Sequence, residues 1–392
     1  MDFDFDAVIN RVGTHSSKWD NMQAKYGVSP ETGIAMWVAD MDFPIAPEIQ
    51  EVLIERVQSS DLGYPISFEK SNLPGLLTER LQERFSWEIN PSEVLSLTDV
   101  VQGLYHAVKL FSSKKDGVII QTPIYPPFLQ CVRELDRNII INPLRQASKK
   151  YEIDFENLEH CLKGKPKILM LCNPHNPTGR VYTREELEKI ALFACRHDLI
   201  ILSDEIHSDL VLDPVPHIPI ASISKEVEAR TITFLSASKS FNIAGLCLAF
   251  VHISDRSLFR VFDELPRHLI GSHNSLSLAA VEAAWTKGGG WLDATLAILT
   301  ENRSYLKNMV DKNWPQVRFY PGEATYLAWM DMRSIGRGEK MAEFFHERSR
   351  VVLSEGETFG SEGKGFVRLN FATSPMILSD ILYRMDRTIQ DS

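Results

Sequence analysis

The stretch FLSASKSFNIAGLCLAF, residues 234–250, contains one lysine, Lys239, between serines and ahead of an apolar run. Ser236, Ser238 and Ser240 lie close to this lysine, which is not the composition of a solvated helix face. A short β-rich run precedes the stretch, so Lys239 is placed in a polar turn at the end of a predicted strand. Such a lysine can serve as a nucleophile or bind a cofactor, although a lysine between serines, taken alone, usually has no special role.

The composition of the 392-residue chain is typical of a soluble globular protein. Apolar residues make up 44% and charged residues 24%, which argues against disorder. The net charge of −10 disfavours nucleic acid or an anionic membrane as the main partner. No apolar run approaches the ~18 residues of a membrane span, and the acidic N-terminus lacks the apolar core of a signal peptide. The length predicts two subdomains.

Metal centres and disulfides are not expected. The five cysteines are odd in number, widely spaced and without a CxxC pair, so we predict neither a disulfide framework nor a zinc site. The histidines show no HExxH or other ligand spacing. We therefore predict no metal and a cytoplasmic location, where thiols stay reduced.

The central part of the chain alternates between short β-rich runs and helix-like segments, which predicts an α/β fold with a mostly parallel sheet between helices. Predicted strands lie at 117–121, 167–172, 199–202 and 231–235, and predicted helices at 71–85, 101–111 and 183–197. A long helix around 291–314 and strands at 325–330 and 366–371 indicate a smaller α+β domain. We predict a large domain over 46–285 and a small one from 1–45 plus 286–392.

Four polar segments follow the predicted strands, at the sheet edge where ligands of open α/β sheets bind. They contain Tyr125, Asn176, Asp204 with His207, and Lys239. Each has a plain structural explanation, such as a turn around Asn176 or a helix cap at Asp204. Together they meet the needs of pyridoxal phosphate: an amine for a Schiff base, a carboxylate for the ring nitrogen, donors near the phenolic oxygen and an aromatic ring to stack on.

On these residues the chain resembles the fold-type I, aspartate-aminotransferase-like superfamily of pyridoxal-phosphate enzymes, over essentially its whole length. The segment SASKSFNIAGLCLA is similar to the family's lysine signature at nearly every position. The resemblance implies a seven-stranded, mostly parallel sheet and Lys239 as the Schiff-base lysine. It also implies that Asp204 pairs with the ring nitrogen, that His207 and Asn176 lie near the phenolic oxygen, and that Tyr125 stacks on the ring.

The remaining cofactor and substrate roles also come from the resemblance. Phosphate ligands would be Ser236, Ser238 and the amides of Val100 and Val101, since a helix N-terminus favours an anion. Tyr64 resembles the tyrosine that reaches the phosphate of a neighbouring subunit, which implies a homodimer with shared active sites. Arg368 resembles the arginine that binds the substrate's α-carboxylate through a bidentate contact.

Several segments narrow the resemblance to the bacterial cystathionine β-lyase and cysteine C–S lyase branch. They are KWD at 18–20, MWVADMDFPIAP at 36–47, TPIYPPF, SDEIHSDLV and SKSFNIAGL. We expect Trp37 and Asp40 to line the substrate pocket, because carboxylates beside a tryptophan are costly to bury without purpose. Cys247 stands where the wider family has a phosphate-binding arginine that this branch also lacks. We interpret Cys247 as a small packed residue, not a nucleophile.

The resemblance implies a pyridoxal-phosphate-dependent lyase that cleaves cystathionine or another S-substituted L-cysteine to a thiol, pyruvate and ammonia. An aminotransferase acting on an L-amino acid is the first alternative, since both reactions begin with loss of the Cα proton. A cofactor-binding regulatory protein with residual lyase activity is the second. The acid that protonates the departing sulfur stays open between Tyr64, Tyr125 and a second use of Lys239.

Overall fold

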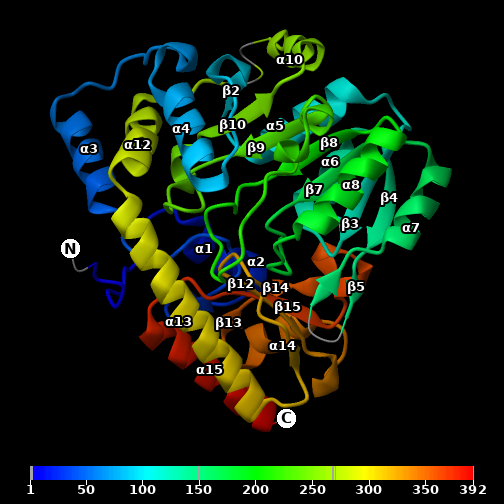
Figure 1. Cartoon of the computed structure of the whole chain (residues 1–392). Coiled ribbons are helices and arrows are strands. Elements are labelled where there is room, and N and C mark those ends of the chain that lie inside the picture. Colours follow the sequence, from blue (N-terminus) through cyan, green and yellow to red (C-terminus); the bar gives the residue numbers. More distant parts are fainter. Residues whose placement is uncertain (1–2, 148–149, 267–268, 270, 392) are drawn as a thin grey trace.

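The computed structural model describes residues 3–147, 150–266, 269 and 271–391. Its main sheet has seven strands in the order β2-β10-β9-β8-β7-β3-β4 (Figure 1). The strands are β2 (Val94–Leu97), β3 (Gly117–Thr122), β4 (Asn138–Pro143), β7 (Pro166–Cys172), β8 (Ile200–Asp204), β9 (Thr231–Leu235) and β10 (Ala249–Ile253). The pairs from β9 to β4 are parallel, and β10 is antiparallel to both neighbours. The predicted α/β fold with a mostly parallel sheet is confirmed.

Both faces of this sheet are buried, which explains the nearly continuous apolar strand sequences. In β7, Ile168 and Met170 belong to the core on one face, and Leu169 and Leu171 to the core on the other. Helices α5 (Val100–Phe111), α6 (Pro126–Glu134) and α10 (Arg256–Asp263) cover the first face. Helices α7 (Phe155–His160), α8 (Arg184–Arg196) and α9 (Lys225–Glu228) cover the second.

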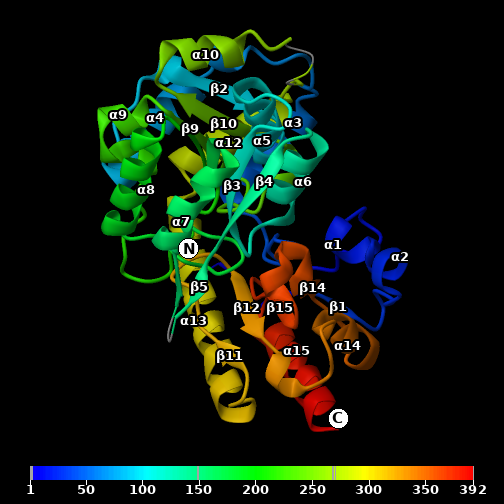
Figure 2. The ribbon, with the colours of Figure 1, turned by 90° about the vertical axis from the view of Figure 1, so that its right-hand side faces the viewer.

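A second, four-stranded sheet is formed mainly by the last quarter of the chain (Figure 2). Its antiparallel strands are β11 (Arg318–Phe319), β12 (Leu327–Asp331), β15 (Phe366–Asn370) and β14 (Ser354–Glu355). The helices of this part are α13 (Gly289–Asn313), α14 (Met341–Arg348) and α15 (Pro375–Gln390). The N-terminal segment joins it, because β1 (Ile34–Ala35) pairs with β13 (Val351–Val352).

The remaining N-terminal elements connect the two sheets. They are α1 (Ser17–Asp20), α2 (Met22–Tyr26), α3 (Pro47–Gln58) and α4 (Leu73–Phe85), and α3 and α4 pack against α12 (Ser275–Thr286). Gly288 separates α12 from α13, and the domain limits predicted at 46 and 285 stay predictions. In the described part of the chain, no helix is both long and apolar enough to cross a bilayer.

Candidate active site

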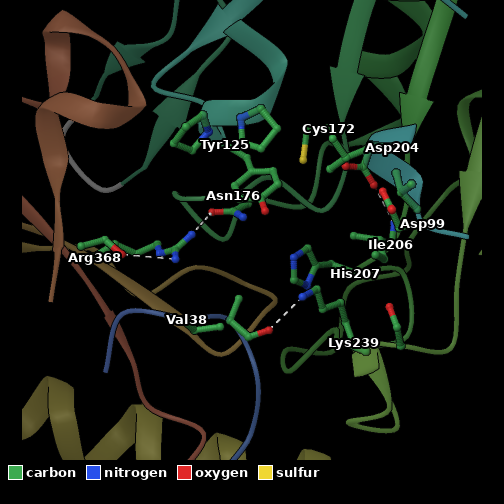
Figure 3. Close-up of a pocket in the computed structure, with 18 of the residues that line it drawn as sticks. Val38, Asp99, Tyr125, Cys172, Asn176, Asp204, Ile206, His207, Lys239 and Arg368 are labelled. Atoms are coloured by element: carbon green, nitrogen blue, oxygen red, sulfur yellow. Dashed lines mark hydrogen bonds between the residues drawn. The ribbon is translucent and has the colours of Figure 1, made fainter. Parts of the chain in front are cut away.

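A cavity of about 700 Å³ opens at the carboxyl edge of the main sheet, between this sheet and the C-terminal part of the chain (Figure 3). The ends of β7, β8 and β9 reach it, as expected for an open parallel sheet. Eleven of the thirteen predicted site residues line it: Trp37, Val100, Val101, Tyr125, Asn176, Asp204, His207, Ser236, Ser238, Lys239 and Arg368. Tyr64 and Asp40 do not.

Lys239 follows β9 and reaches into this cavity. Its Nζ donates a hydrogen bond to the carbonyl oxygen of Ala39 at 2.9 Å. Burial lowers the pKa of the Lys239 amine and the charge of Arg368 adds to this effect, whereas Asp40 and Asp204 oppose it. The environment therefore favours a neutral amine, which can act as a nucleophile or base, more than water would.

Asn242 holds the lysine turn against the N-terminal segment and was missed in the sequence. It adopts a left-handed conformation with a φ of 56°, which asparagine tolerates better than most residues. Its side-chain amide donates to the carbonyls of Met41 and Phe43, and its Oδ1 accepts from the Met41 amide. The turn is thereby fixed relative to the wall that carries Ala39. The sequence did offer a signal for this role, because Asn242 lies within the lysine signature SASKSFNIAGLCLA.

Asp204 ends β8, and its buried carboxylate accepts a hydrogen bond from the Ile206 amide at 3.1 Å. The pKa of Asp204 is raised to about 7, mainly by burial and to a smaller extent by the neighbouring Glu205, against the opposing effects of the Ile206 amide and Lys239. A cation placed beside Asp204 would relieve this cost and keep the carboxylate ionised. The site is therefore prepared for a positively charged ligand atom.

His207 lies one turn beyond Asp204 and is almost fully buried. Burial lowers its pKa to about 3, and Lys239 and Arg368 contribute, so the imidazole is neutral at physiological pH. Its Nδ1 has no hydrogen-bond partner among the described residues. The buried nitrogen is therefore available to a ligand in the cavity.

A buried network behind Asp204 was also missed. Glu205 accepts hydrogen bonds from Ser203 at 2.9 Å, and its other oxygen lies 2.8 Å from Nε2 of His217. His217 in turn lies 3.5 Å from the side chain of Asn173, which begins the NPHNPTG turn. The network joins the ends of β7 and β8. It was missed in the sequence because Glu205 and His217 are twelve residues apart, a spacing that matches no recognisable motif.

The raised pKa of Asp204 predicts a stability change in the cofactor-free protein. A carboxyl group whose pKa is higher in the folded than in the unfolded protein contributes most to the free energy of unfolding below its unfolded pKa, which is near 4. For Asp204 this contribution is lost as the pH rises through the folded pKa of about 7. Between pH 5 and pH 7 the loss is about 2 kcal/mol. Asp204→Asn should therefore unfold at a progressively higher temperature than the wild type as the pH rises, with the difference constant above pH 8.

Thermal unfolding from pH 5 to pH 9 measures this difference. Asp293→Asn is the matched control, because Asp293 is exposed on α13. The control should follow the wild type at every pH. A difference between Asp204→Asn and the wild type that does not change with pH would contradict the assigned pKa shift.

The predicted phosphate ligands gather at the N-terminus of α5. Asp99 caps this helix by accepting from the Gln102 amide at 2.8 Å, and Val100 and Val101 provide two of the first-turn amides that lack intrahelical acceptors. Ser238 lines the same corner. The hydroxyl of Ser236 donates to the carbonyl of Leu248 at 2.7 Å, so its hydrogen is engaged within the protein.

Tyr125 and Asn176 meet on the opposite side of the cavity. The Tyr125 amide donates to the carbonyl of Asn176 at 3.1 Å, and burial raises the pKa of the Tyr125 phenol. The side-chain oxygen of Asn176 accepts from Arg368 at 3.1 Å. Its amide nitrogen then remains the donor that can face a ligand oxygen, as the prediction requires.

Arg368 projects from β15 into the cavity and is 5% exposed. Its guanidinium donates to Asn176, to the carbonyl of Trp37 at 2.7 Å and to Ser354 at 3.3 Å, and no carboxylate of the described residues lies within ion-pair distance. Burial lowers its pKa to about 10, which leaves it charged at neutral pH. A buried cation without an acidic partner is a site for an anion.

Asp40 is not among the residues that line this cavity, and its place in the substrate pocket stays a prediction. Its carboxylate is held 2.7 Å from Arg11 and 3.5 Å from the fully buried Lys18, and Lys18 also pairs with Asp42 at 2.8 Å. These ion pairs engage the Asp40 carboxylate, which is still close enough to affect the pKa of Lys239. The buried carboxylates hold the wall in place, and Trp37 of the same segment does line the cavity.

Tyr64 lies outside this chain's cavity and its side chain is fully exposed, in the loop between α3 and α4. The prediction for Tyr64 concerns a partner's cofactor, so it stays a prediction. Tyr326 was missed: it is buried, and its hydroxyl donates to the carbonyl of Ala39 at 3.1 Å, beside Lys239.

The interpretation of Cys247 as a packed residue is wrong. It is exposed and lines the cavity beside the phosphate corner. The reason is the backbone: Cys247 ends a short 3-10 helix with a φ of 54°, which directs its side chain outward while Leu248 and Phe250 enter the core. Among the described residues, no cluster of three or more histidine, cysteine or acidic side chains forms a metal site.

Comparison with known proteins decides the family. The model of the family described as Aminotransferase class I and II matches residues 67–382. The chain belongs to the class I and II aminotransferase family. The resemblance inferred from the lysine signature is thus confirmed over most of the chain.

Several known proteins are similar to this chain over nearly its whole length. Cystathionine beta-lyase PatB from Bacillus subtilis (strain 168) is 36% identical over 97% of this chain and 98% of the relative. Cystalysin from Treponema denticola, whose structure contains pyridoxal 5'-phosphate, is 32% identical with a TM-score of 0.95 over 100% of both chains. A PLP-bound C–S lyase from Staphylococcus hominis is 31% identical, with a TM-score of 0.92 over 99% of this chain and 98% of the other.

Proposed function

We propose that this protein is a pyridoxal-phosphate-dependent carbon–sulfur lyase that cleaves cystathionine or another S-substituted L-cysteine to a thiol, pyruvate and ammonia. The observation that carries the proposal is the buried guanidinium of Arg368, which has no acidic partner among the described residues and lies in the same cavity as Lys239 and Asp204. This arrangement suits an amino-acid carboxylate beside a reactive amine. The names of the similar proteins favour cleavage of a carbon–sulfur bond.

The side chains around the cavity fit pyridoxal phosphate by their donor chemistry. Asp204 is a buried carboxylate that a cation would stabilise, and His207 has an orphaned buried nitrogen. Lys239 supplies the amine, Tyr125 the aromatic ring, and the α5 N-terminus with Ser238 the phosphate site. When bound, the cofactor supplies an electron sink that allows a proton to leave the α-carbon of an amino acid.

The protein's own groups then have distinct tasks in the reaction. Arg368 binds the α-carboxylate and fixes the orientation of the substrate in the cavity. Lys239 removes the Cα proton, because its amine lies in the cavity in an environment that favours the neutral form. The Cβ–S bond breaks, the sulfur leaves as a thiol, and the remaining three carbons hydrolyse to pyruvate and ammonia.

The family name supports an aminotransferase as the second candidate. The purified protein is therefore incubated with L-cystathionine or S-methyl-L-cysteine, and pyruvate and free thiol are measured. Pyruvate and thiol in equal amounts without any keto acid support the lyase. Product that requires an added keto acid supports the aminotransferase, and cofactor binding with neither product supports the regulatory alternative.

A homodimer is part of the proposal. Exposed apolar side chains lie on α3 and the following loop, among them Ile54, Val57, Leu62 and Ile66 around Tyr64. Apolar side chains gathered in this way favour burial against a second copy. We expect a gel-filtration mass of about twice the 44.5 kDa of one chain.

Tyr64→Phe should weaken cofactor binding about tenfold if the hydroxyl reaches the partner's phosphate, because a hydrogen bond to a charged group is lost. Fluorescence titration with pyridoxal phosphate measures the dissociation constant. Tyr383→Phe is the control, since Tyr383 is also exposed but lies on α15.

Mixing Tyr64→Ala with Lys239→Ala subunits should yield more activity than the two separately, because one site of each mixed dimer is intact. Strictly additive activity would refute sharing.

A cytoplasmic location completes the proposal. All five cysteines have free thiols, including the exposed Cys247. A reducing compartment would preserve them. Thiol titration of protein purified without reductant should find five free thiols per unfolded chain.

A further inference from the structure

Lys25 lies at the cavity mouth, on the helix α2, which stands beside β1 and β14 in Figure 2. Its Nζ is 4.2 Å from the centre of the Trp37 ring and 5.2 Å from that of Tyr26. Cation–π contacts of this kind attract an ammonium group to the ring faces. Lys25 is therefore positioned over the cavity wall although its residue is exposed.

This ammonium has no acidic partner. No carboxylate of the described residues lies within 4.0 Å of Nζ of Lys25, and partial burial lowers its pKa. Most surface lysines pair with solvent alone at little cost, but this one is partly desolvated against two aromatic rings that line the cavity. An anion at the mouth would offset that cost.

Trp37 connects Lys25 to the carboxylate site. Its carbonyl oxygen accepts a hydrogen bond from Arg368 at 2.7 Å, and its ring lies under Lys25. Tyr26, the other ring under Lys25, is close enough to Arg368 for the guanidinium charge to affect the pKa of its phenol. The cavity thus has one cation in its interior and a second at its mouth, on the same wall.

We propose that Lys25 binds a carboxylate on the far side of the substrate's sulfur, so that the enzyme prefers S-substituted cysteines whose substituent carries a carboxylate. Arg368 would hold the α-carboxylate and Lys25 the distal one, with the thioether between them along Trp37. Cystathionine has such a distal carboxylate, whereas S-methyl-L-cysteine does not. This inference rests on the proposed lyase function and specifies its substrate class.

The test compares kcat/KM for L-cystathionine and S-methyl-L-cysteine in the wild type and in Lys25→Met. The variant should lose about tenfold in kcat/KM for cystathionine through KM, with S-methyl-L-cysteine unchanged, because a charge-assisted contact at a half-open site is lost. Lys25→Arg should retain most of the preference. Lys163→Met is the charge-matched control, since Lys163 is exposed and remote from the cavity lining.

Binding of unreactive acids provides a second readout. Suberate carries a carboxylate at each end, with the same number of chain atoms between them as in cystathionine, and octanoate carries only one. Calorimetry should therefore show suberate binding weaken in Lys25→Met while octanoate binding does not. An equal change for both substrates, or for both acids, would overturn the role of Lys25 and leave the lyase function intact. If the wild type turned over neither L-cystathionine nor S-methyl-L-cysteine, the lyase function would be refuted, and this inference with it.

Discussion

Lys239→Ala should lower kcat for thiol release by at least about a thousandfold, the range expected for loss of a positioned base and nucleophile. The side chain is the one amine that both lines the inner cavity and lies beside the buried carboxylate Asp204 in the described structure. Its hydrogen bond to Ala39 shows that it is fixed rather than solvated. Pyruvate production and the visible absorbance of the bound cofactor are measured together.

Both quantities should change in this variant, because one amine is expected to bind the cofactor and to move the Cα proton. Lys225→Ala is a suitable control, since Lys225 is exposed on α9 and pairs with Glu228. The control should retain wild-type turnover and absorbance. Normal turnover in Lys239→Ala would refute the assigned catalytic role and the use of the lysine signature.

The core of the active site could be predicted from local sequence because parallel strands deliver their ends to one edge. Three apolar runs, now β7, β8 and β9, are each followed by polar residues, so Asn176, Asp204 and Lys239 had to lie near one another once the sheet was parallel. The fold followed from the same alternation. Arg368 was different, because it lies on another sheet, and only the family resemblance suggested its place.

The sequence was least informative for side chains whose surroundings depend on distant or unusual backbone contacts. Asp40 was expected in the pocket, but its ion pair with Arg11, 29 residues away, depends on how the N-terminal segment folds back. Cys247 was expected in the core, but a single left-handed residue reverses its direction. Neither the fold of a loop nor one positive φ is encoded in apolar periodicity.

The position of Ala39 shows how these hidden contacts affect the site. Its carbonyl accepts hydrogen bonds from both Lys239 and Tyr326, and the neighbouring Asp40 and Asp42 are fixed by Arg11 and Lys18. The buried ion pairs therefore set the position of the acceptor that holds the reactive amine. Arg11 and Lys18 thus act on the site through this wall without lining the cavity.

Arg368→Ala should lower kcat/KM for L-cystathionine by about a hundredfold to a thousandfold, mainly through KM, because the substrate's carboxylate loses its partner. An amide of the same amino acid lacks that charge, so its much lower kcat/KM should hardly change. Arg368→Lys should recover only part of the loss, since an ammonium cannot make the paired contacts of a guanidinium. Arg184→Ala is the control, because Arg184 is 59% exposed in its side chain and its partner Glu188 is exposed as well.

The same substitution distinguishes a binding residue from a structural one. Breaking a buried ion pair destabilises a fold because it leaves the other charge unpaired, by about 3–5 kcal/mol. Arg368 has no carboxylate partner within the described structure, so its removal leaves no such charge and relieves the cost of burying a cation. Arg368→Ala should therefore keep or raise the melting temperature while activity falls. A large loss of stability together with an unchanged preference for the acid over its amide would show that Arg368 supports the fold, and that the substrate's carboxylate binds elsewhere.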